Sequence, residues 1–161
     1  MNSYPYFAIK ALLLLTLCGS AACSRSNTEA ELRQLAAEKD PRTVVVVKGD
    51  DDKYWAFPAT AIKEVRGKQL HLNERSDEIA FCSGTGTGNQ AVEALRDLIK
   101  AKRQAESSLF SASPFGFGHR EGVPAAQAKI TKDGYMLASF AKPDEIKPIQ
   151  IKEIISSAKI E

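Results

Sequence analysis

The stretch Thr43-Val44-Val45-Val46-Val47-Lys48 decides the fold class of this chain. Five consecutive β-branched residues favour an extended strand, and a run of valines without polar alternation is typical of a strand covered on both faces. We therefore expect residues 43–48 to form a central strand with side chains packed on each side of a sheet. The turn-forming residues 49–52 and the aromatic run at residues 53–57 predict a neighbouring strand, which Pro58 ends.

Further strands are predicted on the C-terminal side of this centre. Apolar alternation indicates a strand at residues 69–73, and the next strand is expected at residues 78–82. Residues 59–64 fit either a helical turn or another strand. The pair Asp133-Gly134 suits a two-residue turn, so residues 129–137 are expected to form a hairpin in which Ile130 faces Leu137. Residues 148–160 fit a strand, or a strand that passes into a helix.

Two helices complete the predicted fold. Thr28-Glu29-Ala30-Glu31 has the form of a capping box, which predicts a helix start, and Pro41 ends this helix near residue 40. The second helix is long and amphipathic and covers about residues 89–105, where apolar residues recur on one stripe. Too few helices lie between strands for a doubly wound parallel sheet. The sequence therefore predicts a single α+β domain at residues 29–161 with a mostly antiparallel sheet.

A short apolar segment near the start of the sequence predicts export. Lys10 is the only charged residue before Arg25, and the apolar run at residues 11–17 is followed by small residues up to Cys23. This arrangement is typical of a signal peptide, because the run is shorter than the roughly 20 residues that a membrane span needs. The ending Ser20-Ala21-Ala22-Cys23 resembles the lipobox of bacterial lipoproteins, with serine where leucine is usual.

The resemblance to bacterial lipoproteins implies where this chain is located. It implies that residues 1–22 are removed, that Cys23 carries the lipid that inserts into the bilayer, and that residues 23–28 form a short tether. Ser24, directly after the cysteine, implies an outer-membrane location facing the periplasm. Ordinary signal cleavage after Ala22 is the alternative, and it would give a periplasmic or secreted protein.

The charge balance argues against nucleic acid as a partner. Residues 1–22 contain Lys10 as their one charged side chain, so their removal lowers the formal net charge from +2 to +1. Proteins that bind nucleic acid usually carry clustered lysine and arginine, and this chain has no such cluster.

A glycine-rich run follows the strand predicted at residues 78–82. Gly84-Thr85-Gly86-Thr87-Gly88 resembles the phosphate loop of tubulin-like GTPases, which would imply a phosphate held by backbone amides at a helix start. The P-loop pattern itself is not met, because Asn89 and Gln90 stand where it needs lysine and a hydroxyl. The alternatives are a site for another anion or small ligand, and a capped helix start, since Thr87 and Gln90 have capping-box spacing. We favour the capped helix start.

Cys82 and the two histidines are the residues that could support thiol chemistry. After processing, Cys82 is the one cysteine besides Cys23, and His71 or His119 could serve as a base in a thiol-dependent enzyme or redox protein. Nothing in their spacing indicates a zinc site or a catalytic pair, so no metal, cofactor or catalytic residue is assigned. Burial of Cys82 as a small apolar residue is the alternative that we favour.

Aromatic residues indicate a surface for a protein partner. Residues 107–124 are rich in glycine, proline and serine and are expected to form a loop that carries Phe110, Phe115, Phe117 and Arg120. These residue types dominate binding energy when they are exposed, and Trp55 is a further candidate. Folding of the loop phenylalanines onto the core is the alternative. The sequence thus favours a non-enzymatic, membrane-anchored envelope protein that binds another protein, such as an assembly accessory, inhibitor or immunity protein.

Overall fold

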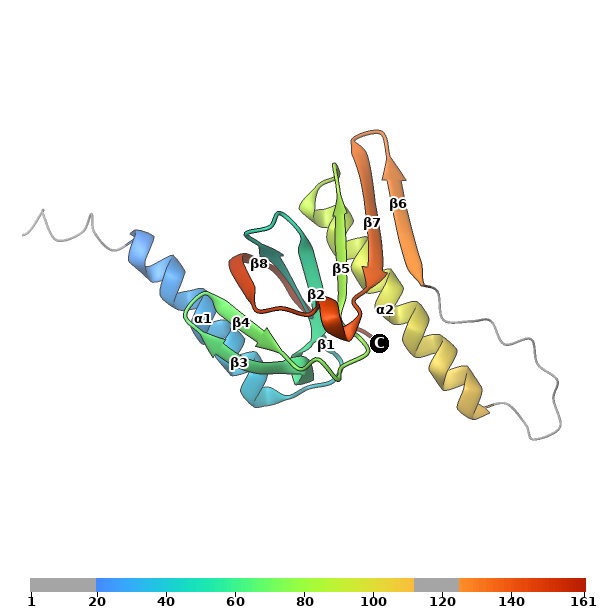
Figure 1. The fold of residues 1–161 in the computed structure, drawn as a ribbon, viewed down its shortest axis with the longest axis horizontal. Coiled ribbons are helices and arrows are strands. Elements are labelled where there is room, and N and C mark those ends of the chain that lie inside the picture. The colour runs from blue at the N-terminus through green and yellow to red at the C-terminus, as the bar shows by residue number, and fades with distance from the viewer. Residues whose placement is uncertain (1–19, 112–124) are drawn as a thin grey trace, which may run out of the picture.

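The computed structural model describes the backbone of residues 20–111 and 125–161, and the side chains of residues 27–107 and 125–161. Within these ranges, two helices and an eight-stranded antiparallel sheet form a small α+β domain (Figure 1). The predicted fold class is confirmed.

The structure contains the following elements in chain order. They are α1 (Ser20–Glu38), β1 (Thr43–Gly49), β2 (Tyr54–Pro58), the 3-10 turn η1 (Ala59–Ala61), β3 (Ile62–Arg66), β4 (Gln69–Leu72), β5 (Ala80–Gly84), α2 (Gly88–Ser111), β6 (Ala126–Thr131), β7 (Gly134–Phe140), the 3-10 turn η2 (Pro143–Glu145) and β8 (Ile149–Lys159). The strand order across the sheet is β3-β4-β8-β1-β2-β5-β7-β6. β3 and β6 are therefore the two edges of the sheet.

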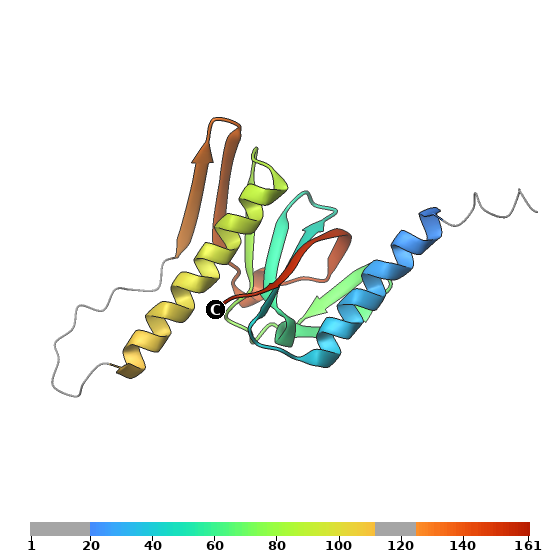
Figure 2. The same ribbon diagram turned by 180° about the vertical axis from the view of Figure 1, so that it is seen from behind.

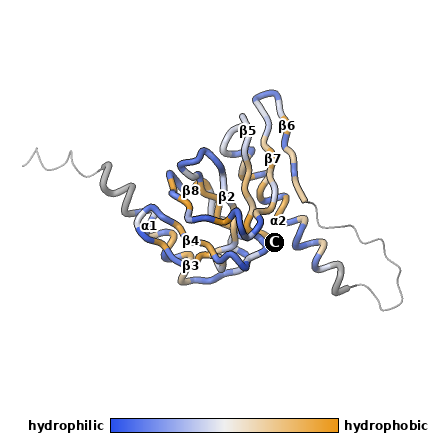
Figure 3. The backbone as a smooth tube through the Cα atoms, in the orientation of Figure 1, coloured by the Kyte–Doolittle hydropathy of each residue, from blue (hydrophilic) through white to orange (hydrophobic). Residues whose placement is uncertain are grey.

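The valine run of β1 is packed on both faces, as predicted. Val44 and Val46 belong to a core cluster that includes the buried stripe of α2, whereas Val45 and Val47 belong to a second cluster that includes Leu32 of α1. All four valines are at most 1% exposed. Because successive side chains of a strand point to opposite faces, one four-residue run contributes to both cores. The hydrophobic colour of the inner strands and the hydrophilic colour of the turns agree with this arrangement (Figure 3).

The long strand β8 connects the two parts of the sheet. Ile149 and Gln150 pair with β4, whereas the rest of β8 pairs with β1, with register shifts at two points. Such irregularities bend a strand and increase its twist. As a result, α1 lies beside β3 and β4 at one end of the molecule, and α2 lies beside β5 and β7 at the other (Figures 1 and 2).

Several predicted boundaries differ from those observed. α1 begins at Ser20, before the predicted capping box at Thr28, because residues 20–28 contain no glycine or proline that would end a helix. α2 extends to Ser111 instead of residue 105. Residues 59–64 form a helical turn followed by a strand, and the ambiguous C-terminal segment is a strand, β8.

The predicted register of the last hairpin is wrong. The turn consists of Lys132 and Asp133, so that Thr131 pairs with Gly134 and Ile130 lies opposite Tyr135 instead of Leu137. Gly134 follows the turn and has a φ of +142°, a conformation that L-residues rarely adopt. The prediction placed this glycine inside the turn because the Asp-Gly pair is most common there.

Candidate functional site

The glycine-rich loop at residues 84–88 is fastened to neighbouring structure by its own polar groups. The amide of Thr87 donates to Oε1 of Gln90 (2.9 Å), and the amide of Gln90 donates to Oγ1 of Thr87 (3.4 Å), which is the predicted capping box. The amide of Gly86 donates to the carbonyl of Tyr135 (3.1 Å) on β7. Amides of this loop therefore serve to cap α2 and to hold β7, which supports the capped helix start over a phosphate cradle.

Close backbone packing explains why positions 84 and 134 are occupied by glycine. Gly84 has a φ of +153°, and a Cβ added there would lie 3.1 Å from Cα of Met136 and closer still to the carbonyl oxygen of Tyr135. A Cβ on Gly134 would come within 2.9 Å of the amide of Gly86. The glycines thus allow the turn between β6 and β7 to approach the loop, a structural requirement that involves no ligand.

Cys82 and His71 do not form a pair in this fold. Cys82 is fully buried in the core beneath α2, and burial raises the pKa of its thiol to about 12. His71 is on β4, which is separated from the strand of Cys82 by three intervening strands. The favoured interpretation of Cys82 as a buried apolar residue agrees with the structure, because a thiol in this environment is protonated at neutral pH. His119 lies outside the described residues.

The remaining predicted site residues have different positions. Phe115, Phe117 and Arg120 lie outside the described residues, and Phe110 lies in the last turns of α2, where only the backbone is described. Cys23 likewise falls within the backbone of α1. Within the described ranges, no group of histidine, cysteine and carboxylate side chains could hold a metal ion, and neither helix is long and apolar enough to cross a bilayer.

Exposed apolar side chains collect on the hairpin of β6 and β7. Ile130 is 79% exposed, Tyr135 52% and Leu137 50%, and they are the large hydrophobic residues that stand out as exposed in the described part of the chain. They share the face opposite α2, because the alternating residues Met136 and Ala138 are buried against that helix. Among the strands that the structure describes, β6 pairs with β7 alone, so the unpaired backbone groups of a sheet edge lie beside this apolar face.

The sequence did not reveal this surface, although a signal for it was present. β7 carries apolar residues on both of its faces, and a strand with two apolar faces must either be covered twice or leave one face exposed. Of the two helices in the described residues, α2 is the one available for this hairpin, since α1 packs against β3 and η1 at the other end of the sheet. Counting the helices against the apolar faces would have predicted that one face of this hairpin stays exposed, but not which one.

A pocket of about 520 Å³ lies on the same side of the sheet as this apolar face. Its apolar part is formed by Trp55, Phe81 and Ile149, and the rings of Trp55 and Phe81 contact each other with a centroid distance of 5.3 Å. Phe81 pairs with Ser139, which lies two residues after Leu137 on β7, so the pocket and the hairpin face are neighbours. Trp55 is only 6% exposed, and the pocket is the route by which a ligand could reach it.

Comparison of the chain with family models, with curated proteins and with solved structures finds no match. Two neighbouring features of the described surface are candidates for a functional site: the exposed apolar face of the β6–β7 hairpin, and the pocket at Trp55 and Phe81.

Proposed function

We propose that this chain is a lipid-anchored protein of a bacterial cell envelope that binds another protein through its β6–β7 hairpin. The resemblance of residues 20–23 to a lipobox supports the anchor, with Cys23 as the acylated residue. The exposed apolar face of the hairpin supports the binding activity. Assembly accessory, inhibitor and immunity protein are all roles compatible with such a module.

One observation carries the binding proposal, namely the exposure of Ile130, Tyr135 and Leu137 on a single hairpin face. Isolated exposed apolar residues are normal on a protein surface, but a contiguous group on one face marks an interaction site. The adjacent edge of β6 adds backbone donors and acceptors, which an extended segment of a partner could pair with.

The arrangement of the elements favours a protein over the bilayer as the occupant of this face. The first residues of α1, which include Cys23, lie at the end of the molecule opposite the β6–β7 hairpin (Figures 1 and 2). A lipid on Cys23 would hold that end at the membrane. The hairpin would then face the aqueous compartment, where a protein partner is available.

A capture experiment in a bacterial host tests this proposal. The wild-type chain, an Ile130→Ser/Leu137→Ser variant and a Lys63→Ser/Lys68→Ser control on the exposed hairpin of β3 and β4 would each be recovered from gently cross-linked cells. All four positions are exposed, so the variants are expected to fold like the wild type. We expect one protein to be recovered with the wild type and the control and to be lost with the hairpin variant. Recovery of the same protein with all three would contradict the proposal.

A further inference from the structure

The pocket at Trp55 and Phe81 has a chemical character that indicates what it accepts. It is open to solvent between the β1–β2 turn and the segment from η2 to the start of β8, and the amide of Asp50 donates to the carbonyl of Gln150 (2.8 Å) where these two walls meet. Its volume of about 520 Å³ is in the range of ligand-binding pockets. Its floor is aromatic, and its rim is charged.

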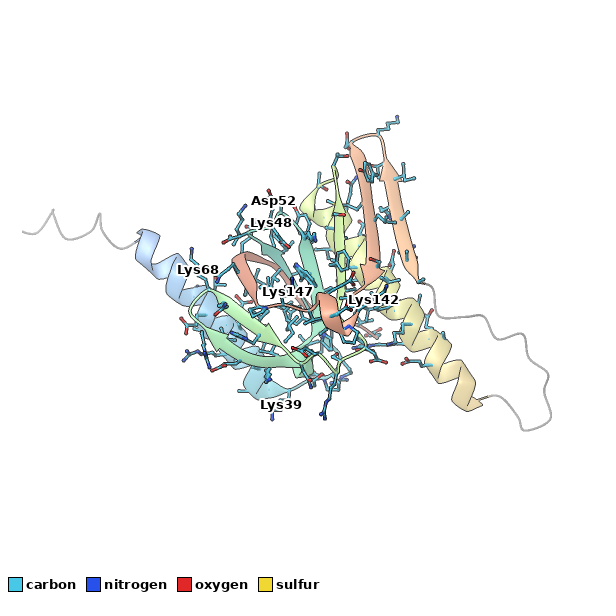
Figure 4. All side chains as sticks on the ribbon, viewed as in Figure 1. Lys39, Lys48, Asp52, Lys68, Lys142 and Lys147 are labelled. Carbon is cyan, nitrogen blue, oxygen red and sulfur yellow. The ribbon has the colours of Figure 1, made fainter. Side chains whose placement is uncertain are left out.

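The rim carries an excess of negative charge. It contains four carboxylates and two ammonium groups, which leaves a balance of −2; they belong to Asp50, Asp51, Asp144, Glu145, Lys53 and Lys147. None of the four carboxylates forms an ion pair with a residue that the structure describes, in contrast to acidic residues elsewhere such as Asp52, Glu78 and Glu93. Figure 4 labels Lys147 near the centre of the view, with Asp52 of the β1–β2 turn above it and Lys142, beside η2, to its right.

The floor of the pocket already shows the geometry of a cation over an aromatic ring. Nζ of Lys53 lies 5.4 Å from the centroid of Phe81, within the distance at which a ring attracts a cation. Lys53 is exposed and has no ion-pair partner among the described residues, so its flexible side chain can move aside. Trp55, packed against Phe81, adds a second aromatic surface for a planar or aliphatic group.

We infer that this pocket binds the basic side chain, arginine or lysine, of the protein that docks on the β6–β7 hairpin. The inference rests on the proposed function, because the pocket adjoins the hairpin face through Phe81 and Ser139. The methylene groups of such a side chain fit against Trp55 and Ile149, and its charged end lies among the rim carboxylates, which form no ion pair with a described residue. A guanidinium group fits best, since it is planar, stacks on aromatic rings and is more weakly hydrated than an ammonium group.

The pocket can be tested without knowledge of the partner. Trp55 is the only tryptophan of the chain, so its fluorescence reports events in the pocket. The probe is L-argininamide, and the control is L-citrullinamide, which has nearly the same shape and the same α-amino group but lacks the guanidinium charge. Both are titrated into the purified full chain. A ligand of this size is expected to bind with a Kd of order 1 mM.

Two variants and one control locate the binding. Asp50→Asn and Asp144→Asn each remove one rim carboxylate that has no hydrogen bond to a described residue, and Asp97→Asn removes an exposed carboxylate of α2 outside this pocket. We expect each rim variant to weaken argininamide binding about two- to fivefold, and Asp97→Asn to leave it unchanged. Equal binding of citrullinamide, the absence of saturable binding, or rim variants that bind like the wild type would overturn the inference. Because the probe does not touch Ile130 or Leu137, such a failure would leave the hairpin proposal untouched.

Discussion

Substitution of Gly84 by alanine should separate a structural role of the glycine-rich loop from a ligand-binding role. Gly84 ends β5 and pairs with Met136 of β7, with a φ of +153°. An added Cβ would lie 3.0 Å from the carbonyl carbon of Tyr135 and 3.1 Å from Cα of Met136, with the carbonyl oxygen nearer still. All three neighbouring atoms belong to the backbone, so no rotation of a side chain can relieve the contact.

The expected loss of stability follows from these contacts. A non-glycine residue in this conformation costs about 1–3 kcal/mol, and separation of β5 from β7 at this point weakens backbone hydrogen bonds worth about 1 kcal/mol each. With two such bonds weakened, the sum is about 3–5 kcal/mol, which corresponds to a decrease in Tm of roughly 10–20 °C for a domain of this size. Gly67→Ala is the matched control, because Gly67 also has a positive φ (+59°) but an added Cβ would have no atom within 4 Å. There we expect a loss of about 1 kcal/mol.

Thermal unfolding followed by circular dichroism measures both variants, and titration with inorganic phosphate or GTP tests the ligand hypothesis on the same samples. The structural account predicts that Gly84→Ala is several times more destabilising than Gly67→Ala and that neither ligand raises the Tm of the wild type. A Gly84→Ala variant that unfolds like the wild type, together with a Tm of the wild type that rises with phosphate or GTP, would refute this reasoning.

Three further predictions follow from individual side chains. Lys102 is 6% exposed, and its Nζ donates to the carbonyl of Asp77 (2.7 Å). Lys102→Met removes this hydrogen bond and should lower the free energy of unfolding, measured by urea titration, by about 1–3 kcal/mol. A loss below about 0.5 kcal/mol would contradict a stabilising role of this hydrogen bond. Cys82 should fail to react with a thiol reagent at pH 8 in the folded protein and react fully in denaturant, whereas rapid reaction in the folded state would restore the thiol-enzyme hypothesis. The hydrogen bond from the Arg42 amide and that from the Lys159 side chain lower the pKa of Asp40 from 3.8 to about 2. A carboxyl with a lowered pKa stabilises the folded state above its unfolded pKa, and this stabilisation is lost as the pH falls through the folded pKa. Asp40→Asn should therefore make Tm less dependent on pH between about 4 and 2. An unchanged dependence of Tm on pH would contradict this role of Asp40.

Local patterns predicted the parts of the fold that depend on near neighbours in the sequence. The valine run of β1 predicts a strand buried on both faces, as observed. The apolar stripe of α2 and the capping box of Thr87 and Gln90 also involve only residues that are close together in the sequence. The hairpin register was missed because it depends on Gly134 packing against the loop at Thr85 and Gly86, about 50 residues away.

The candidate site could be predicted only in part for the same reason. Trp55 was singled out as a binding residue from its type, but the pocket around it is formed by the β1–β2 turn and by residues 144–150, which lie almost 100 positions later in the chain. The exposure of Ile130 and Leu137 depends on which sheet face α2 covers, and no local pattern contains that information.

Site-specific photo-cross-linking tests the central claim of partner binding at the hairpin most directly. A photoreactive amino acid would replace Tyr135, which is 52% exposed on the β6–β7 hairpin, or Lys63, which is exposed on β3 at the opposite edge of the sheet. We expect irradiation of living cells to give one discrete cross-linked protein from position 135 and none from position 63. Cross-linking from position 135 to lipid alone, or the same products from both positions, would contradict the claim.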